Sequence, residues 1–185
     1  MSTKRGLDEF RLPRWNELPP VPLYLEQVLA LLEEWLGPYL NDGKRKVMTR
    51  TMINNYVKLQ FIPAPVNKKY DQITVASLFV IAVLKPAFTI EEIAYLIQLA
   101  LNHSQRQVAY DGFCAYLEEA VKHAFDRTTM EREHNPEDPR QILWNACNTV
   151  ACQIYVRKIY LEEAMAQAAT PLDEMVEKSG GRIHG

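Results

Sequence analysis

The sequence predicts an all-α fold with at most one small hairpin, and two observations support this prediction. The chain is 48% hydrophobic and has only seven glycines among 185 residues, which is typical of a packed helical protein. Its apolar residues recur at three- and four-residue spacing, often after a residue that caps helices. The length suffices for one or two domains with a substantial core.

We predict four regions along the chain. Residues 1–21 form an extended N-terminal arm, because their prolines exclude a continuous helix. Residues 22–88 form a first helical module, residues 89–170 a second, and residues 171–185 a tail. The arm is expected to dock on the rest of the domain through its apolar side chains, which are Phe10, Leu12, Trp15 and Leu18.

The first helix is expected to begin at Pro22, because proline suits the first turn of a helix. It should run to about Leu36, where Gly37-Pro38 stops it. Residues 39–46 then read as a loop, in which Asn41-Asp42-Gly43 forms a turn.

A basic segment (residues 44–70) follows this helix and contains no acidic residue. The whole chain has a formal charge of −2 and the basic segment carries +7, so the remainder sums to −9. A local cationic patch on an acidic protein indicates a local anionic partner, for which nucleic acid is the first candidate. The seven cations are Lys44, Arg45, Lys46, Arg50, Lys58, Lys68 and Lys69.

The centre of the basic segment predicts a helix over residues 49–60, with Thr49 as its N-cap. At about 100° per residue, its hydrogen-bonding side chains gather on one face and its apolar ones on the other. Arginine, lysine and asparagine are side chains that read base edges or contact phosphates. A solvated polar face of an ordinary amphipathic helix is the alternative. The polar face consists of Arg50, Thr51, Asn54, Asn55 and Lys58.

After this helix come Phe61-Ile62, a Pro-Ala-Pro turn, the sequence VNKKY (residues 66–70) and an apolar helix capped by Asp71. This order resembles the DNA-binding head of MerR-type transcription regulators, over about 40 residues. In the resemblance, Asn54 and Asn55 replace an arginine–aromatic pair, and Gln60 replaces a glycine. The chain also resembles an uncharacterised bacterial domain family with a MerR-like head, through the segments LPRWNELP, LYLEQV, TMINNYVK and NKKY.

The resemblance implies a winged helix-turn-helix module that binds double-stranded DNA. Helix 49–60 would enter the major groove, and the wing around Lys68-Lys69 would contact phosphates. The implied DNA-binding residues are Thr49, Arg50, Thr51, Asn54, Asn55, Lys58, Lys68, Lys69 and Tyr70.

Further helices are predicted downstream of the basic segment. One runs from Asp71 to Leu84, and a second, with a capping box at residues 89–92, reaches about Leu101. Residues 104–107 fit the same box for a helix to about Asp126, in which Gly112 permits close packing or marks a break. The longest helical pattern spans residues 139–169, and its apolar spacing makes it the candidate element for a homodimer.

No residue pattern indicates catalysis, a metal or a cofactor, so we expect the protein not to be an enzyme. Cys147 and Cys152 lie about 140° apart on a helix, and no two histidines have metal-ligand spacing. The aromatic residues of the second module either fill its core or line a pocket for a small-molecule effector. They are Tyr110, Phe113, Tyr116, Phe125, Trp144, Tyr155 and Tyr160.

The expected location is the bacterial cytoplasm, without a membrane partner. No apolar stretch approaches the length of a membrane span, and no signal-peptide core is present at the N-terminus. The three cysteines include no C-x-x-C pair and give no disulfide framework. The expected function is transcriptional regulation through sequence-specific DNA binding; the alternative is a helical interaction or scaffold protein that keeps this fold without binding DNA.

Overall fold

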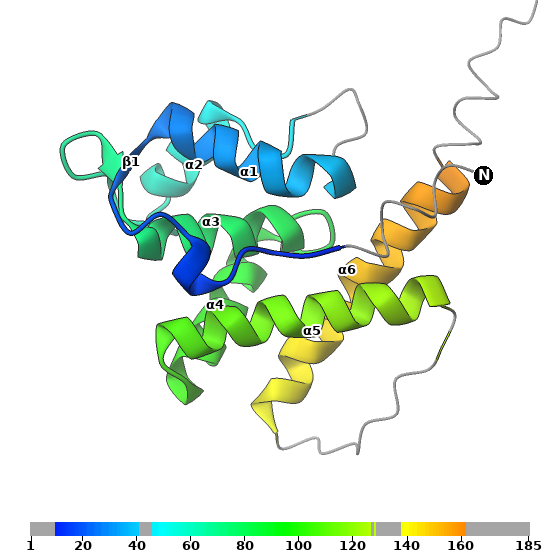
Figure 1. Cartoon of the computed structure of the whole chain (residues 1–185). Helices are drawn as coiled ribbons and strands as arrows, with labels where there is room; N and C mark the ends of the chain where they lie inside the picture. Colours follow the sequence, from blue (N-terminus) through cyan, green and yellow to red (C-terminus); the bar gives the residue numbers. More distant parts are fainter. Residues whose placement is uncertain (1–9, 41–45, 127, 129–137, 162–185) are drawn as a thin grey trace, which may run out of the picture.

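The computed structural model describes residues 10–40, 46–126, 128 and 138–161, and it confirms the helical fold class (Figure 1). The N-terminal half contains η2 (Trp15–Glu17), β1 (Leu23–Tyr24), α1 (Leu25–Leu40), α2 (Arg50–Lys58) and β2 (Lys69–Tyr70). The remainder contains α3 (Gln72–Leu84), α4 (Ile90–His103), α5 (Arg106–Asp126), α6 (Pro139–Val156) and the π-helical η3 (Arg157–Leu161).

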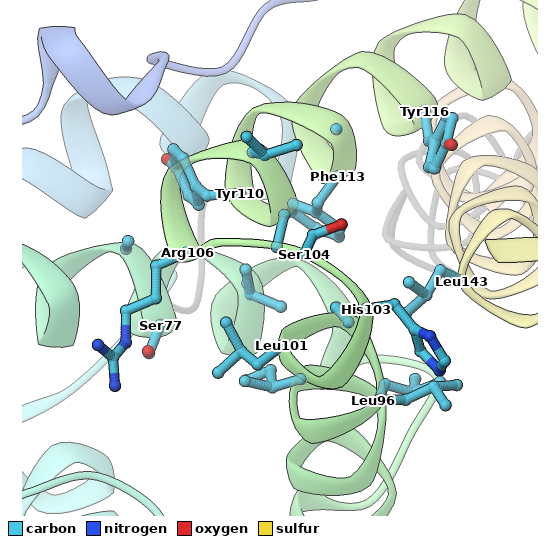
Figure 2. Close-up of a pocket in the computed structure, with 18 of the residues that line it drawn as sticks. Ser77, Leu96, Leu101, His103, Ser104, Arg106, Tyr110, Phe113, Tyr116 and Leu143 are labelled. Atoms are coloured by element: carbon cyan, nitrogen blue, oxygen red, sulfur yellow. The ribbon is translucent and has the colours of Figure 1, made fainter. Parts of the chain in front are cut away.

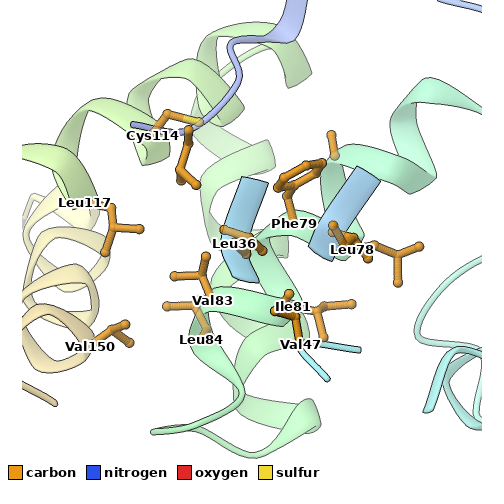
Figure 3. Packing of buried hydrophobic residues seen from close by; sticks show 14 of the residues in the cluster. Leu36, Val47, Leu78, Phe79, Ile81, Val83, Leu84, Cys114, Leu117 and Val150 are labelled. Carbon is orange, nitrogen blue, oxygen red and sulfur yellow. The ribbon is translucent and has the colours of Figure 1, made fainter. Parts of the chain in front are cut away.

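The central element is α3, which lies between α1 and α5 (Figure 1). Nine of its thirteen residues are buried, and a helix that is apolar on all sides belongs inside a protein. It contacts α1, α4, α5 and α6, so one hydrophobic cluster extends from Phe10 to Ile154. Figure 3 shows Leu36, Val83, Leu117 and Val150 within this cluster, one each from α1, α3, α5 and α6.

The N-terminal arm docks as predicted. Leu12 and Leu18 are buried, and the single turn η2 lies between them. The Arg14 guanidinium donates to both carboxylate oxygens of Glu118 on α5, at 2.8 and 2.6 Å. The Gln72 amide donates to the carbonyls of Trp15 and Leu18, which attaches the arm to α3.

The start of the first helix was predicted wrongly. Leu23 and Tyr24 are not helical but form β1, which pairs antiparallel with β2 in the register Leu23–Tyr70 and Tyr24–Lys69. Because this pairing joins residues 45 and 47 positions apart, local sequence does not reveal it. The helix begins at Leu25 instead of Pro22.

The end of this helix was also predicted wrongly, because α1 continues through Gly37-Pro38 to Leu40. Proline removes one hydrogen bond of the last turns, but the residues after it gain tertiary contacts: Tyr39 packs edge-on against Phe10 at 4.7 Å between ring centroids. The loop at residues 39–46 is therefore shorter than expected, and its turn at residues 41–43 lies outside the described residues.

The predicted caps mostly form. Asp71 accepts from the Thr74 amide at 2.8 Å, and Thr89 with Glu92 makes the expected capping box. The box at residues 104–107 does not form as predicted, because α5 begins at Arg106 and Ser104 ends α4 instead.

Gly112 neither breaks α5 nor permits close packing. The helix continues through it, and a Cβ at this position would meet no atom within 4 Å. The long C-terminal helix is present from Pro139 to Val156, and η3 follows it. The remainder of the predicted helix lies beyond the described residues. In the part of the chain that is described, no helix combines the length and the apolar character needed to cross a bilayer.

Candidate nucleic-acid interface

The first part of the candidate interface is α2, which packs on the core through one face and exposes the other. The Thr49 hydroxyl accepts from the Met52 amide at 3.3 Å, so the predicted N-cap is confirmed. Ile53 is fully buried and anchors the helix to the core. The polar face turns to solvent as predicted, and its exposed residues are Arg50, Thr51, Asn54, Asn55 and Lys58.

Arg50 is the one member of this face with a charged partner of opposite sign among the described residues. Its guanidinium is paired with Glu26 of α1, and both side chains are largely exposed. Arg50 also lies close enough to Tyr70 to act on the pKa of its hydroxyl. Arg50 therefore joins α2 to α1, and its charge is partly compensated.

The end of α2 has the geometry of a Schellman motif. The Phe61 amide donates to the Tyr56 carbonyl at 2.9 Å, and the Gln60 amide donates to that of Val57 at 3.0 Å. Gln60 has φ 61°, the left-handed conformation that glycine adopts most readily. The position at which the MerR resemblance has a glycine is thus one where backbone geometry favours glycine.

The second part of the interface is a tight hairpin that corresponds to the predicted wing. Val66 and Lys69 exchange both backbone hydrogen bonds, at 3.0 and 2.9 Å, around the two-residue turn Asn67-Lys68. Both turn residues have positive φ, 51° and 63°, as a type I′ turn requires. The turn presents the exposed Lys68 at its tip.

The base of the wing is built by aromatic residues. The Lys69 ammonium lies 4.7 Å from the centroid of the Tyr24 ring, a cation–π contact across the β1–β2 pair. Tyr70 is 4% exposed, and its burial raises the pKa of its hydroxyl. Tyr70, which the resemblance assigns to DNA, therefore supports the wing from inside.

Three contributors to this surface were not identified from the sequence. Glu26 and Tyr24 come from the region before and within α1, more than 20 residues away from their partners. Lys85 follows α3, and its ammonium lies 3.8 Å from the Met52 sulfur of α2. Partial burial lowers the pKa of Lys85. None of the three could be predicted from residues 44–70, because all three lie outside that segment.

The potential nucleophiles and metal ligands are dispersed. Burial raises the pKa of the Cys114 and Cys147 thiols to about 12, so both are neutral at pH 7. The His123 ring contacts the Thr128 hydroxyl at 2.6 Å. Within the described ranges, no three histidine, cysteine or acidic side chains come together in a way that suits a metal ion.

The predicted aromatic set divides between two environments. Tyr110, Phe113 and Tyr116 of α5 line a cavity of about 290 Å³ between α3, α4, α5 and α6 (Figure 2). Phe125 instead packs edge-on against Tyr155 of α6, with 5.0 Å between ring centroids. Part of the set therefore lines a cavity, and another part packs between α5 and α6. The side chain of Tyr160 lies outside the described residues.

The comparisons with known proteins place the chain in a family. No curated protein and no solved structure matches the chain. One family model matches residues 13–116, more than half of the sequence, from the docked arm through α2 and the wing to the middle of α5. Its description is "Domain of unknown function (DUF1836)", and the chain belongs to this family.

Proposed function

We propose that this protein binds double-stranded DNA and regulates transcription, with α2 in the major groove and the wing against the phosphate backbone. The observation that carries the proposal is the exposed polar face of α2, together with the exposed Lys68 at the tip of the hairpin. Every side chain of this face donates hydrogen bonds and none is acidic. An α-helix of this kind has the width and the donors that the major groove accepts.

The local architecture supports a MerR-like form of this interface. Three features follow one another in the order that the resemblance implies. They are the capped helix, the left-handed residue Gln60 after it, and the short hairpin. Lys58 and Lys68 are exposed cations on either side of Gln60 in the sequence. Phosphate contacts from such cations fix the register of a protein on DNA, while base contacts from the helix read the sequence.

The test is the salt dependence of binding to a fluorescent random-sequence duplex of 30 base pairs. Four to six phosphate contacts predict a slope of log K against log [salt] of about −4 to −5. The slope is measured by fluorescence anisotropy from 50 to 200 mM salt. Lys68→Ala should make it shallower by about one. Lys122→Ala is the matched control, because it removes the same charge from an exposed site on α5.

A slope near zero, or no binding at 50 mM salt, contradicts the proposal. If the duplex binds, selection from a random DNA library then identifies the preferred sequence.

The second candidate is a helical interaction protein that keeps this fold without binding DNA. One observation favours it: apolar side chains flank the wing in exposed positions, with Val66 76% and Tyr24 51% exposed. The pairing of Arg50 with Glu26 also weakens the positive potential of the helix face. If this protein elutes from heparin below 100 mM salt and binds no duplex, the second candidate is the better account.

A further inference from the structure

The cavity beside α3 is separate from the candidate nucleic-acid interface and has the features of a ligand site. It opens among α3, α4, α5 and α6, and its wall is mostly aliphatic and aromatic (Figure 2). None of the residues that line it is acidic. Its volume of about 290 Å³ is near the lower limit for small-molecule sites.

The volume indicates the size of the occupant. An apolar cavity of about 150 Å³ holds one benzene molecule, so this cavity accommodates roughly twice that, about ten to twelve carbon atoms. Gly112 lies in the wall, and the space beyond its Cα is empty.

The charge at the rim indicates the polar group. The cations that line the cavity are Arg106 and Arg140, and His103 lines it as well. Arg140 is engaged by Asp138, to which it donates three side-chain hydrogen bonds of 2.8 to 3.0 Å. Arg106 is exposed and has no ion pair among the described residues.

The backbone around Arg106 adds to its positive potential. Arg106 is the first residue of the 21-residue α5, where unsatisfied amide groups and the helix dipole favour an anion. Ser104, which also lines the cavity, provides a hydroxyl at the same rim. An apolar cavity with one uncompensated guanidinium at its edge is complementary to a molecule with an apolar body and one negative end.

We propose that this cavity binds a small amphipathic carboxylate, with an apolar body of about ten carbons inside and its carboxylate on Arg106. A guanidinium holds a carboxylate through two parallel hydrogen bonds, which a neutral alcohol of the same length does not form. The site is independent of the proposed DNA binding, because neither the cavity nor Arg106 belongs to the candidate interface.

The test is calorimetric titration of the full-length protein with decanoate and with decanol, in the absence of DNA. Decanoate should bind one per chain with a Kd below about 1 mM, which requires only ordinary efficiency from its twelve heavy atoms. Decanol should bind at least about tenfold more weakly, because it cannot accept the bidentate hydrogen bonds.

Three variants separate the charge from the cavity. Arg106→Gln should weaken decanoate about tenfold and leave decanol unchanged. Lys122→Gln is the matched control, because it removes the same charge from an exposed position on α5 that does not line the cavity, and decanoate should bind as tightly as to the wild type. Gly112→Leu should abolish both, since Gly112 lines the cavity, an added Cβ meets no atom within 4 Å, and leucine is a better helix former than glycine. Thermal melts establish that each variant is folded.

Several results overturn the proposal. They are the absence of decanoate binding below 1 mM, equal affinity for decanoate and decanol, and undiminished binding by folded Gly112→Leu. A second copy of the chain is the competing occupant, since Val108 at the rim is 60% exposed. If light scattering finds a dimer that Val108→Asp dissociates, and the wild type binds no decanoate, the cavity is an interface.

Discussion

Gln60 lies in a backbone conformation that favours glycine, at the position where the MerR resemblance has a glycine. It adopts φ 61° at the end of α2, where a side chain meets steric resistance that glycine does not. We expect Gln60→Gly to raise the free energy of unfolding by about 0.5–1 kcal/mol, the relief of strain less the entropy that glycine gains in the unfolded chain. Urea denaturation followed by circular dichroism measures this change.

Gln60→Ala serves as the control for this substitution. Alanine also removes the exposed side chain but keeps the Cβ, so it should leave stability within about 0.5 kcal/mol. Equal stabilisation by both variants would mean that the side chain, and not the backbone conformation, is unfavourable at this position.

Glu26 is the residue that limits the positive charge of the candidate interface. Its carboxylate pairs with Arg50, yet both side chains are more than 60% exposed, so the pair contributes little to stability. We expect Glu26→Gln to free the guanidinium and to tighten duplex binding about threefold to tenfold at 100 mM salt. Fluorescence anisotropy measures the affinity.

Glu34→Gln is the matched control for Glu26. It makes the same change of net charge at an exposed position of α1, about 12 Å further along the helix axis. Should both variants tighten binding equally, net charge and not Arg50 is responsible. Should Glu26→Gln have no effect, Arg50 does not face the DNA.

At the scale of elements, α2 and the wing are expected to make different contributions. In the proposed complex the wing lysines contact phosphates, so Lys68→Ala with Lys69→Ala should weaken all duplexes alike and reduce the salt slope. Asn54→Ala or Asn55→Ala should instead cost about 1–3 kcal/mol on the preferred sequence and nothing on random DNA. Competition titrations with the two duplexes separate the effects.

The asparagine variants decide which element reads bases. Both side chains are exposed and neither caps the helix, so their removal should not disturb the fold. If they weaken specific and random DNA equally, α2 is not the base reader.

The elements differ in how far sequence alone predicts them. The caps at Thr49, Asp71 and Thr89 were predictable because each acts within one helical turn. The strand β1 and the continuation of α1 through Pro38 were not, because both depend on partners distant in sequence. The polar face of α2 followed from periodicity, whereas its pairing with Glu26 did not.

The candidate ligand cavity illustrates the same limit. Its aromatic residues were identified from composition, but the division between cavity and core depends on how α5 and α6 cross. The role of Gly112 depended on space that only the assembled helices define.

At the scale of the whole molecule, α6 is both a core helix and the candidate dimerisation element. The predicted seam is used within the chain: Cys147, Val150 and Ile154 are buried, and α6 packs most extensively on α5. A second stripe remains on the exposed side at three- and four-residue spacing, which suits a helix–helix contact. It consists of Ile142, Asn145, Thr149, Cys152 and Val156.

We expect a homodimer at micromolar concentration, because a single reader of this size offers too few base contacts to select one site in a genome. Light scattering gives the mass. Thr149→Lys with Val156→Asp, both on the exposed stripe, should yield a folded monomer with an unchanged melting temperature.

Deletion of residues 139–185 is the complementary experiment, and it should produce aggregates. Removing α6 uncovers the apolar surface of α5 and of α3, which no other described element covers. A full-length protein that is monomeric at micromolar concentration would contradict the predicted homodimer. It would also favour the interaction-protein alternative, since a single exposed α2 face whose one arginine is already paired provides little basis for sequence selection.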